Sequence, residues 1–308
     1  MHGLRQFIHH ANPSSESHPD TRAIIRALDA AIDTLEPLIV PLLGKPSTGK
    51  TGLLEYWAGP YRHHEREIAI DRQPVLLAEI SVTEKASLGR SVYTTPTACV
   101  TFSSIMYALG ELSRQVDPPM HVPRWYREER SLYTDQQFLW LFDQVCRETR
   151  RLRVKAIVLD NAHHIDVPTM ESLLRFHRRL QGHVGLVLCA QLAKNEQLDE
   201  PLGKVFARAK VDPAECDQAI ELRPLTKAVF DAEVIMEIFA DLNADFEAGL
   251  ETHASFISDA LWQLTAGDWK SMNSRVRHFN RLLPSPESSK RVITRTIVEQ
   301  VLGKKLPS

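Results

Sequence analysis

Gly44-Lys45-Pro46-Ser47-Thr48-Gly49-Lys50-Thr51 is the stretch that decides the fold of this chain. It fits the pattern G-x-x-x-x-G-K-[ST] at every constrained position. The apolar segment 38–43 precedes it and reads as a buried strand, and the segment that begins at Gly52 can open a helix. A strand, a glycine-rich turn and a helix in this order aim several backbone N–H groups and the positive end of a helix at one anion. The stretch therefore predicts a phosphate-binding loop.

Each part of this loop has an expected role. Gly44 and Gly49 allow the backbone to turn tightly, so that the residues from Gly44 to Gly52 can line a nucleotide. Lys50 would reach the β- and γ-phosphates of ATP, and the Thr51 hydroxyl would ligate Mg²⁺. We therefore expect ATP and Mg²⁺ as cofactors.

Composition limits the class of protein. The chain has 308 residues and a net charge of −2, enough for one large domain or for a large and a small one. Near-zero charge argues against a surface that binds polyanions everywhere, but it allows a local basic patch. The sequence has no apolar run of roughly 20 residues and no signal-peptide core at its start. The cysteines are scattered and form no C-x-x-C pair, which predicts a reducing, cytoplasmic location: Cys99, Cys146, Cys189 and Cys216.

Apolar strand-like segments alternate with helical patterns through the first two thirds of the chain. This alternation predicts an α/β fold, with a parallel sheet flanked by helices on both faces. Ligands of such sheets bind at the carboxyl ends of the strands. The expected strands cover residues 38–43, 75–80, 154–159 and 184–190, and the expected helices cover 21–35, 97–114, 134–151 and 168–180.

The pattern changes near residue 225. Residues 1–20 are rich in turn formers and are expected to be a flexible arm, and residues 21–225 are expected to form the nucleotide-binding domain. After a short strand at 220–222 we expect no further strands. The remaining residues, 226–308, are predicted to be a small helical lid, with helices at 226–243, 253–265, 269–283 and 290–302.

Asp160 and Asn161 follow an apolar strand and carry the second chemical signal. A carboxylate at a strand end after a phosphate loop typically holds Mg²⁺, directly or through water. The next position in such hydrolases is normally a glutamate that polarises the attacking water, but here it is Asn161. An amide can hold a water molecule but cannot accept its proton. The sequence therefore supports nucleotide binding better than ATP turnover, and ATP hydrolysis is expected to be slow. His163 and His164 could supply a base or could simply pack beneath the site.

With these motifs in place, the chain resembles AAA+ ATPases over about residues 20–285. Within that class it is most similar to the transposition-regulator ATPases of the TnsC, TniB and MuB group and to relatives such as ExeA-type secretion ATPases. Three stretches carry the closer resemblance. Residues 74–80 with 105–110 resemble a second strand and its following helix, and 186–192 leading to 205–208 resembles the sensor-1 strand and an arginine-bearing segment. The third stretch resembles sensor 2 and is Leu264-Thr265-Ala266-Gly267-Asp268-Trp269-Lys270.

The resemblance implies further site residues. Gln191 stands where the class has a polar sensor of the γ-phosphate. Arg208 resembles the arginine that a neighbouring subunit inserts as a finger, and Arg223 is a less suitable alternative. Lys270 stands where sensor 2 usually has an arginine. Asn161 departs from the class pattern.

The resemblance also implies partners. Such ATPases form homo-oligomeric rings or helical filaments on double-stranded DNA and touch phosphates from the loop after the second strand. In this chain that loop holds Lys85, Arg90 and Thr94. Phosphate contacts carry little sequence information, so binding would be largely non-specific and salt-sensitive. Two alternatives stay open: a loop that is only solvated, and contact through the basic helix faces around Arg150 and Arg178.

Three functions fit these features. The first is an ATP-dependent DNA-binding regulator that recruits or activates a transposase. The second is a nucleotide-driven switch of the secretion or signalling type, which a membrane segment or a peptidoglycan-binding tail would favour. The third is a replication-initiator-like ATPase, which a winged helix after the lid would favour.

Overall fold

The computed structural model describes residues 21–33, 38–46, 48–62, 74–80, 96–114, 135–180, 183–192, 200–223, 225–231, 242, 244–284 and 291–307. Lys85, Arg90 and Thr94, Ser47 of the phosphate loop and the arm 1–20 therefore lie outside the described residues. The chain divides into two compact units. The first consists of Ile25–Pro46 and Leu54–Glu221, and the second contains Leu222–Ser308 together with Ser47–Leu53, the end of the phosphate loop and the start of the helix that follows it. We retain residue 225 as the proposed start of a lid.

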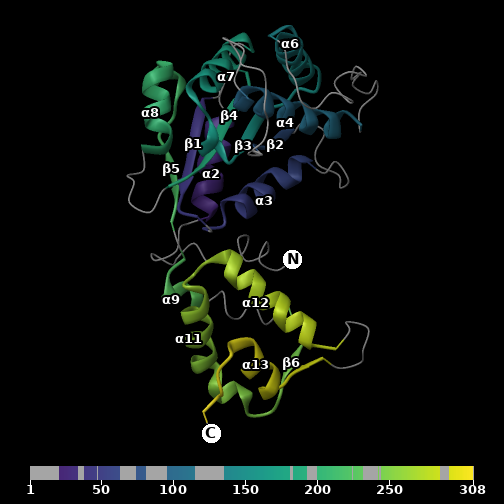
Figure 1. Cartoon of the computed structure of the whole chain (residues 1–308), viewed down its shortest axis with the longest axis vertical. Coiled ribbons are helices and arrows are strands. Elements are labelled where there is room, and N and C mark those ends of the chain that lie inside the picture. The colour runs from purple at the N-terminus through teal and green to yellow at the C-terminus, as the bar shows by residue number, and fades with distance from the viewer. Residues whose placement is uncertain are drawn as a thin grey trace. The chain divides into compact units, whose positions relative to one another are not determined.

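A five-stranded sheet with the order β2-β3-β4-β1-β5 forms the centre of the first unit (Figure 1). Neighbouring strands pair in parallel from β2 through β3 and β4 to β1. Parallel strands need long crossover connections, which is why strand and helix alternate along the sequence. The predicted α/β fold with a parallel sheet is confirmed. The strands are β1 (Ile39–Gly44), β2 (Val75–Glu79), β3 (Ala156–Asp160), β4 (Gly185–Gln191) and β5 (Ile220–Leu222).

Helices of this unit lie close to the predicted ranges 21–35, 97–114, 134–151 and 168–180, whereas no helix was predicted over 200–209. Their positions follow from amphipathic patterns that bury one side of each helix against the sheet. α7 has a typical start, because the Asp166 side chain accepts a hydrogen bond from the Thr169 backbone N–H at 2.9 Å and a proline follows the cap. The helices are α2 (Thr21–Ile32), α3 (Lys50–Arg62), α4 (Pro96–Ser113), α6 (Asp135–Arg151), α7 (Val167–Arg179) and α8 (Glu200–Ala209).

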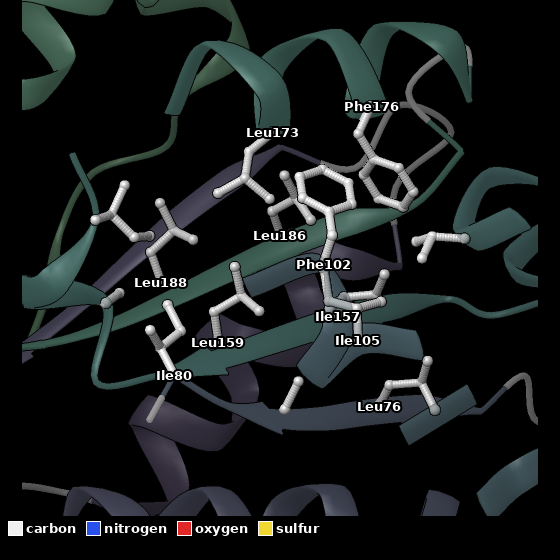
Figure 2. Packing of buried hydrophobic residues seen from close by; sticks show 14 of the residues in the cluster. Leu76, Ile80, Phe102, Ile105, Ile157, Leu159, Leu173, Phe176, Leu186 and Leu188 are labelled. Carbon is white, nitrogen blue, oxygen red and sulfur yellow. The ribbon is translucent and has the colours of Figure 1, made fainter. Parts of the chain in front are cut away.

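One face of the sheet is covered by an aromatic cluster from α4, α6 and α7. Phe102 is fully buried, and its ring meets Phe138 and Phe176 edge-to-face, with centroids 5.5 and 5.9 Å apart. Edge-to-face pairs add about 0.5–1.5 kcal/mol to the stabilisation from burial. Figure 2 shows α4 packing onto the strands through Phe102 and Ile105, and α7 through Leu173 and Phe176. These side chains gather over Ile157, Leu159, Leu186 and Leu188 of the sheet.

The opposite face of the sheet is buried as well. Val40 of β1 and Val158 of β3 point away from the aromatic cluster, since side chains alternate along a strand, and neither is exposed. α2 and α3 supply further buried apolar residues and are joined by a hydrogen bond of 2.8 Å from the Trp57 indole N–H to Asp29 Oδ1. Burial on both faces explains why these strands read as continuous apolar runs rather than alternating ones.

The second unit is built from α9 (Lys227–Val229), α11 (Ala254–Thr265), α12 (Trp269–Leu282) and α13 (Arg295–Leu302). Their apolar faces enclose a separate core. Its fully or almost fully buried members include Phe230, Ile257, Phe279, Val298 and Val301. Among the described helices of both units, none is long and apolar enough to cross a lipid bilayer.

The prediction that strands end at residue 222 is wrong. β6 (Asp245–Phe246) and β7 (Val292–Ile293) form a small parallel sheet, and the Glu247 N–H donates to the Ile293 carbonyl at 3.0 Å. The predicted helix at 290–302 accordingly begins only at Arg295, where the Thr294 hydroxyl accepts the Ile297 N–H. Two-residue strands show no periodicity, and their pairing joins distant parts of the chain, so a local pattern cannot reveal them.

Candidate functional site

The ends of four strands bring the candidate site together at one edge of the sheet. Gly44, the last residue of β1, lies opposite Gln191, the last residue of β4. Asp160, the last residue of β3, lies opposite Glu79, the last residue of β2. β4 lies between β1 and β3, so these four residues occur along the same carboxyl edge. The roles predicted for Gly44, Asp160 and Gln191 require this arrangement, because ligands bind at such an edge.

The phosphate loop leaves β1 at this edge and runs into α3. Gly49 has a φ of 91°, a conformation that side chains other than glycine rarely adopt, which explains the glycine of the motif. α3 begins at Lys50, and the Leu53 N–H donates to the Gly49 carbonyl at 2.9 Å. The first N–H groups of the helix thus follow the loop directly, as an anion-binding turn requires.

The exposure of the loop residues varies. Lys45, Pro46 and Thr51 are exposed, Gly49 and Gly52 are half-buried, and the side chains of Thr48 and Lys50 are buried. The Leu192 N–H donates to the Gly44 carbonyl at 3.0 Å, which holds the end of β4 against the start of the loop. Gln191 is exposed at that point and is therefore placed beside the loop rather than inside the core.

Asp160 is a buried carboxylate, 5% exposed, at the edge where ligands bind. Its Oδ1 accepts the backbone N–H of Asn161 at 2.8 Å. Asn161 has a φ of 60° and turns the chain into the short helix η1 (Ala162–His164). Asparagine tolerates this left-handed conformation better than most residues, so the local backbone accounts for its presence. His163 and His164 follow in η1 with ring centroids 4.1 Å apart.

Glu79 is a site residue that sequence reasoning missed. Its Oε1 accepts a hydrogen bond of 3.2 Å from Nδ2 of Asn161, and its side chain is exposed. The available signal was the same as for Asp160, a carboxylate directly at the end of an apolar strand. What the sequence could not show is that β2 and β3 are neighbours, because a long segment that includes the described helices α4 and α6 separates the two strands along the chain.

The oxygen donors at this edge suit Mg²⁺. Among the described residues, no group of three or more His, Cys, Asp or Glu side chains could hold a metal ion by itself. Mg²⁺ usually takes only one or two protein ligands and completes its shell with phosphate oxygens and water. A hydroxyl at Thr51 and a carboxylate at Asp160 match that requirement in type and number.

Arg208 and Lys270 each lie on a helix, Arg208 on α8 and Lys270 on α12. Arg208 is exposed in the last turn of α8. Lys270 is the second residue of α12, and its side chain is not among those that the structure describes. A tight turn places the start of α12: Ala266 and Gly267 have φ values of 48° and 75°, and the Asp268 side chain accepts the Ser271 N–H at 2.6 Å. Both residues keep their predicted roles as proposals.

The basic faces of α6 and α7 are largely occupied by ion pairs within the chain. Arg178 donates two hydrogen bonds of 2.7 Å to the Glu215 carboxylate, which lower the pKa of Glu215. Arg179 pairs with Asp143 on α6. Arg151 likewise pairs with Glu148 at 2.7 Å. Arginines that satisfy carboxylates in this way are less available to DNA phosphates, so the alternative DNA surface around Arg150 and Arg178 is weakened.

None of the four cysteines forms a disulfide bond. Burial raises the pKa of Cys99 to about 12 and that of Cys146 to about 11. These thiols stay protonated at neutral pH and are poor nucleophiles. They therefore take no part in the candidate site.

No protein-family model and no curated protein matches the chain. Solved structures do match it. The structure of the Aeropyrum pernix Orc1 protein in complex with DNA aligns with a TM-score of 0.52 and 15% identity, covering 97% of this chain and 68% of that one. The chain shares the fold of that protein, and its five-stranded parallel sheet flanked by helices fits an α/β P-loop domain. The Walker-type ATPase PABY2304 of Pyrococcus abyssi aligns with a TM-score of 0.49 and 13% identity, over 87% of this chain and 69% of that one.

Likeness at these identities shows the fold alone. The similarity to the TnsC, TniB and MuB group stays a prediction.

Proposed function

We propose that this AAA+ chain binds ATP and Mg²⁺ at the carboxyl edge of its sheet. The observation that supports this most directly is the register of strand ends: the phosphate loop leaves β1 at Gly44, which lies beside Gln191, and Asp160 ends the next strand along. Loop N–H groups and Lys50 would bind the phosphates. Thr51 and Asp160 would hold Mg²⁺, which neutralises charge on the phosphates when it is bound.

Three further residues complete the proposed nucleotide site. Gln191 would contact the γ-phosphate, because it is exposed beside the loop. Lys270 would approach the nucleotide from the proposed lid, residues 226–308. Arg208 would act on the nucleotide of a neighbouring copy, and its exposure on α8 is compatible with a role across a subunit interface.

We further propose that ATP-bound copies assemble as a ring or helical filament on double-stranded DNA. Lys85, Arg90 and Thr94 would contact phosphates from the loop that follows β2. One or two such contacts are weak in a single copy, but repetition along the assembly makes them strong. The Orc1 structure with which the chain shares its fold is in complex with DNA. The ion pairing of the α6 and α7 arginines also favours the loop over those helix faces.

The biological role proposed from the resemblance is that of a cytoplasmic regulator which recruits or activates a transposase on target DNA. A replication-initiator-like ATPase is the second candidate, and the likeness to Orc1 is the observation that favours it. The two differ in what they require of the DNA. A target-DNA regulator of the kind proposed coats any sequence, whereas an initiator prefers particular sites.

A DNA mobility-shift titration tests this function. The probes are two duplexes of equal length and unrelated sequence, each titrated with the protein in ATP, in ADP and without nucleotide. We expect cooperative, ATP-dependent binding of both duplexes that weakens steeply with salt. Lys50→Ala is the matched control, since it removes the charge that the phosphates need and should abolish ATP binding and the shift together. Wild-type ATP affinity in Lys50→Ala, or a DNA shift that is indifferent to nucleotide, would refute the proposal.

A strong preference for one of several sequences would instead favour the initiator-like role. Co-precipitation of a transposase encoded beside this chain, dependent on ATP and DNA, would favour the regulator. The ATP-binding proposal is measured separately, by titration of a fluorescent ATP analogue, so that its outcome does not depend on the DNA result.

A further inference from the structure

The position after Asp160 carries an amide, which leaves the proposed ATPase without the base that its class normally has there. Asn161 cannot accept a proton from water, because an amide nitrogen and oxygen are not basic at neutral pH. The neighbouring strand β2 supplies a carboxylate, Glu79, directly opposite Asp160. We propose that Glu79 is the general base for ATP hydrolysis in this protein, an inference that rests on ATP binding at the proposed site.

The register places Glu79 at the required position. Glu79 and Asp160 are opposite each other as the last residues of β2 and β3, and the Ile80 N–H donates to the Asp160 carbonyl at 3.0 Å. The Glu79 carboxylate therefore lies along the same edge as the proposed metal ligand. Glu79 is exposed, so water can reach it.

Asn161 orients this carboxylate. Its Nδ2 donates to Oε1 of Glu79 at 3.2 Å, which fixes one of the two carboxylate oxygens. A carboxylate has about four acceptor positions, and one hydrogen bond leaves capacity to hold and deprotonate a water molecule. The amide at position 161 and the carboxylate at position 79 thus act as a pair. The amide positions the base, and the carboxylate accepts the proton.

The backbone explains why the carboxylate stands on β2 rather than after Asp160. Asn161 has a φ of 60° and a ψ of 31°, a left-handed conformation in which asparagine is favoured over glutamate. Asp160 is not an alternative base, because it is buried and its Oδ1 already accepts the Asn161 N–H at 2.8 Å. Another basic candidate among the described residues is His164 in η1, which forms a pair with His163 and is exposed.

The oxygen of the bound water forms a bond to the γ-phosphorus while the bond from that phosphorus to the β–γ bridging oxygen breaks. The bonding electron pair leaves with ADP. The proton of the water passes to the Glu79 carboxylate, which later releases it to solvent, and inorganic phosphate departs.

Two substitutions separate proton acceptance from simple positioning. Glu79→Gln keeps the length of the side chain and an oxygen that accepts the Asn161 amide, but it removes the basicity. Asn161→Gly removes the amide while glycine still adopts the left-handed backbone. ATP turnover is measured at saturating ATP and Mg²⁺ with duplex DNA present, and ATP affinity is measured separately with a fluorescent analogue. Circular dichroism confirms that each variant is folded.

We expect Glu79→Gln to bind ATP with wild-type affinity and to lose turnover by about 10²- to 10⁴-fold, the usual contribution of a general base. Asn161→Gly should lose about tenfold or less, since it removes one positioning hydrogen bond. His164→Ala should retain turnover.

Wild-type turnover in Glu79→Gln would overturn the assignment, and so would a larger loss in Asn161→Gly or in His164→Ala than in Glu79→Gln. A wild-type protein that binds ATP but never hydrolyses it, even on DNA, would also overturn the role of Glu79 while leaving the proposed nucleotide binding intact. Failure of the wild-type protein to bind ATP at all would overturn both proposals.

Discussion

The turn between α11 and α12 gives a sharp test of local packing. Gly267 has a φ of 75°. A Cβ atom at this position would lie 2.9 Å from Cη2 of Trp262 and 3.1 Å from the carbonyl oxygen of Leu225. The first distance is shorter than carbon–carbon contacts allow, and the second involves backbone, which cannot rotate away. Gly267→Ala should therefore destabilise the second unit.

The expected magnitude follows from three contributions. A left-handed conformation costs an L-residue about 1–2 kcal/mol. The overpacking against Trp262 and Leu225 should cost about 1–3 kcal/mol more. The lower entropy of the unfolded alanine chain returns about 0.4–1 kcal/mol. The free energy of unfolding should therefore fall by about 1–5 kcal/mol. Each kcal/mol lowers the Tm of a small unit by about 4–8 °C.

Gly249→Ala is the matched control. Gly249 has a φ of 87°, but no described atom lies within 4 Å of the position of an added Cβ. This variant has the strain without the clash and should lose only about 1 kcal/mol. Urea unfolding followed by tryptophan fluorescence compares the midpoints of the two variants at equal m-value. Equal midpoints would show that Trp262 and Leu225 move aside at no cost, and they would refute the prediction that a Cβ at position 267 clashes with them.

Three further predictions concern the proposed activity. Asp160→Asn keeps an oxygen that accepts the Asn161 N–H and should stay folded, yet lose Mg²⁺-dependent turnover by about 10²-fold or more; unchanged turnover in a Mg²⁺ titration would exclude Asp160 as a ligand. Arg208→Ala should leave ATP binding by dilute protein intact and weaken assembly and hydrolysis, because a finger acts only across an interface; sedimentation and ATP titration distinguish this from a structural defect, which would lower both. Lys85→Ala with Arg90→Ala should lose the DNA shift and keep ATP affinity; normal coating of duplex DNA would locate the contact elsewhere.

Much of the candidate site could be predicted because its signals are local. The loop from Gly44 to Thr51 is continuous in sequence, and its chemistry depends on a strand, a turn and a helix that follow one another. Asp160 likewise ends a run of apolar residues, and both faces of that strand are buried. A strand buried on both faces is apolar throughout, so its start and end can be read from composition.

The prediction of no strands after residue 222 was wrong because it relied on local sequence patterns, the same patterns that made the other predictions correct. β6 and β7 are two residues each and exist only because they pair with each other, which no window of sequence displays. The basic faces of α6 and α7 show the same limit: the sequence reveals the arginines, but their pairing with Glu215 and Asp143 depends on which helices are neighbours.

The sequence by itself determined the phosphate loop, the alternation of strands and helices, and hence the α/β class, because each depends on residues within one or two turns or strands of one another. The tertiary structure alone decided the strand order, with β4 between β1 and β3 and with β2 beside β3. That order brings Glu79 to Asn161 across 82 positions of sequence. Pairing between distant strands is chosen by how whole faces of the sheet are buried together, so the contact between Glu79 and Asn161 is visible only after the sheet has formed.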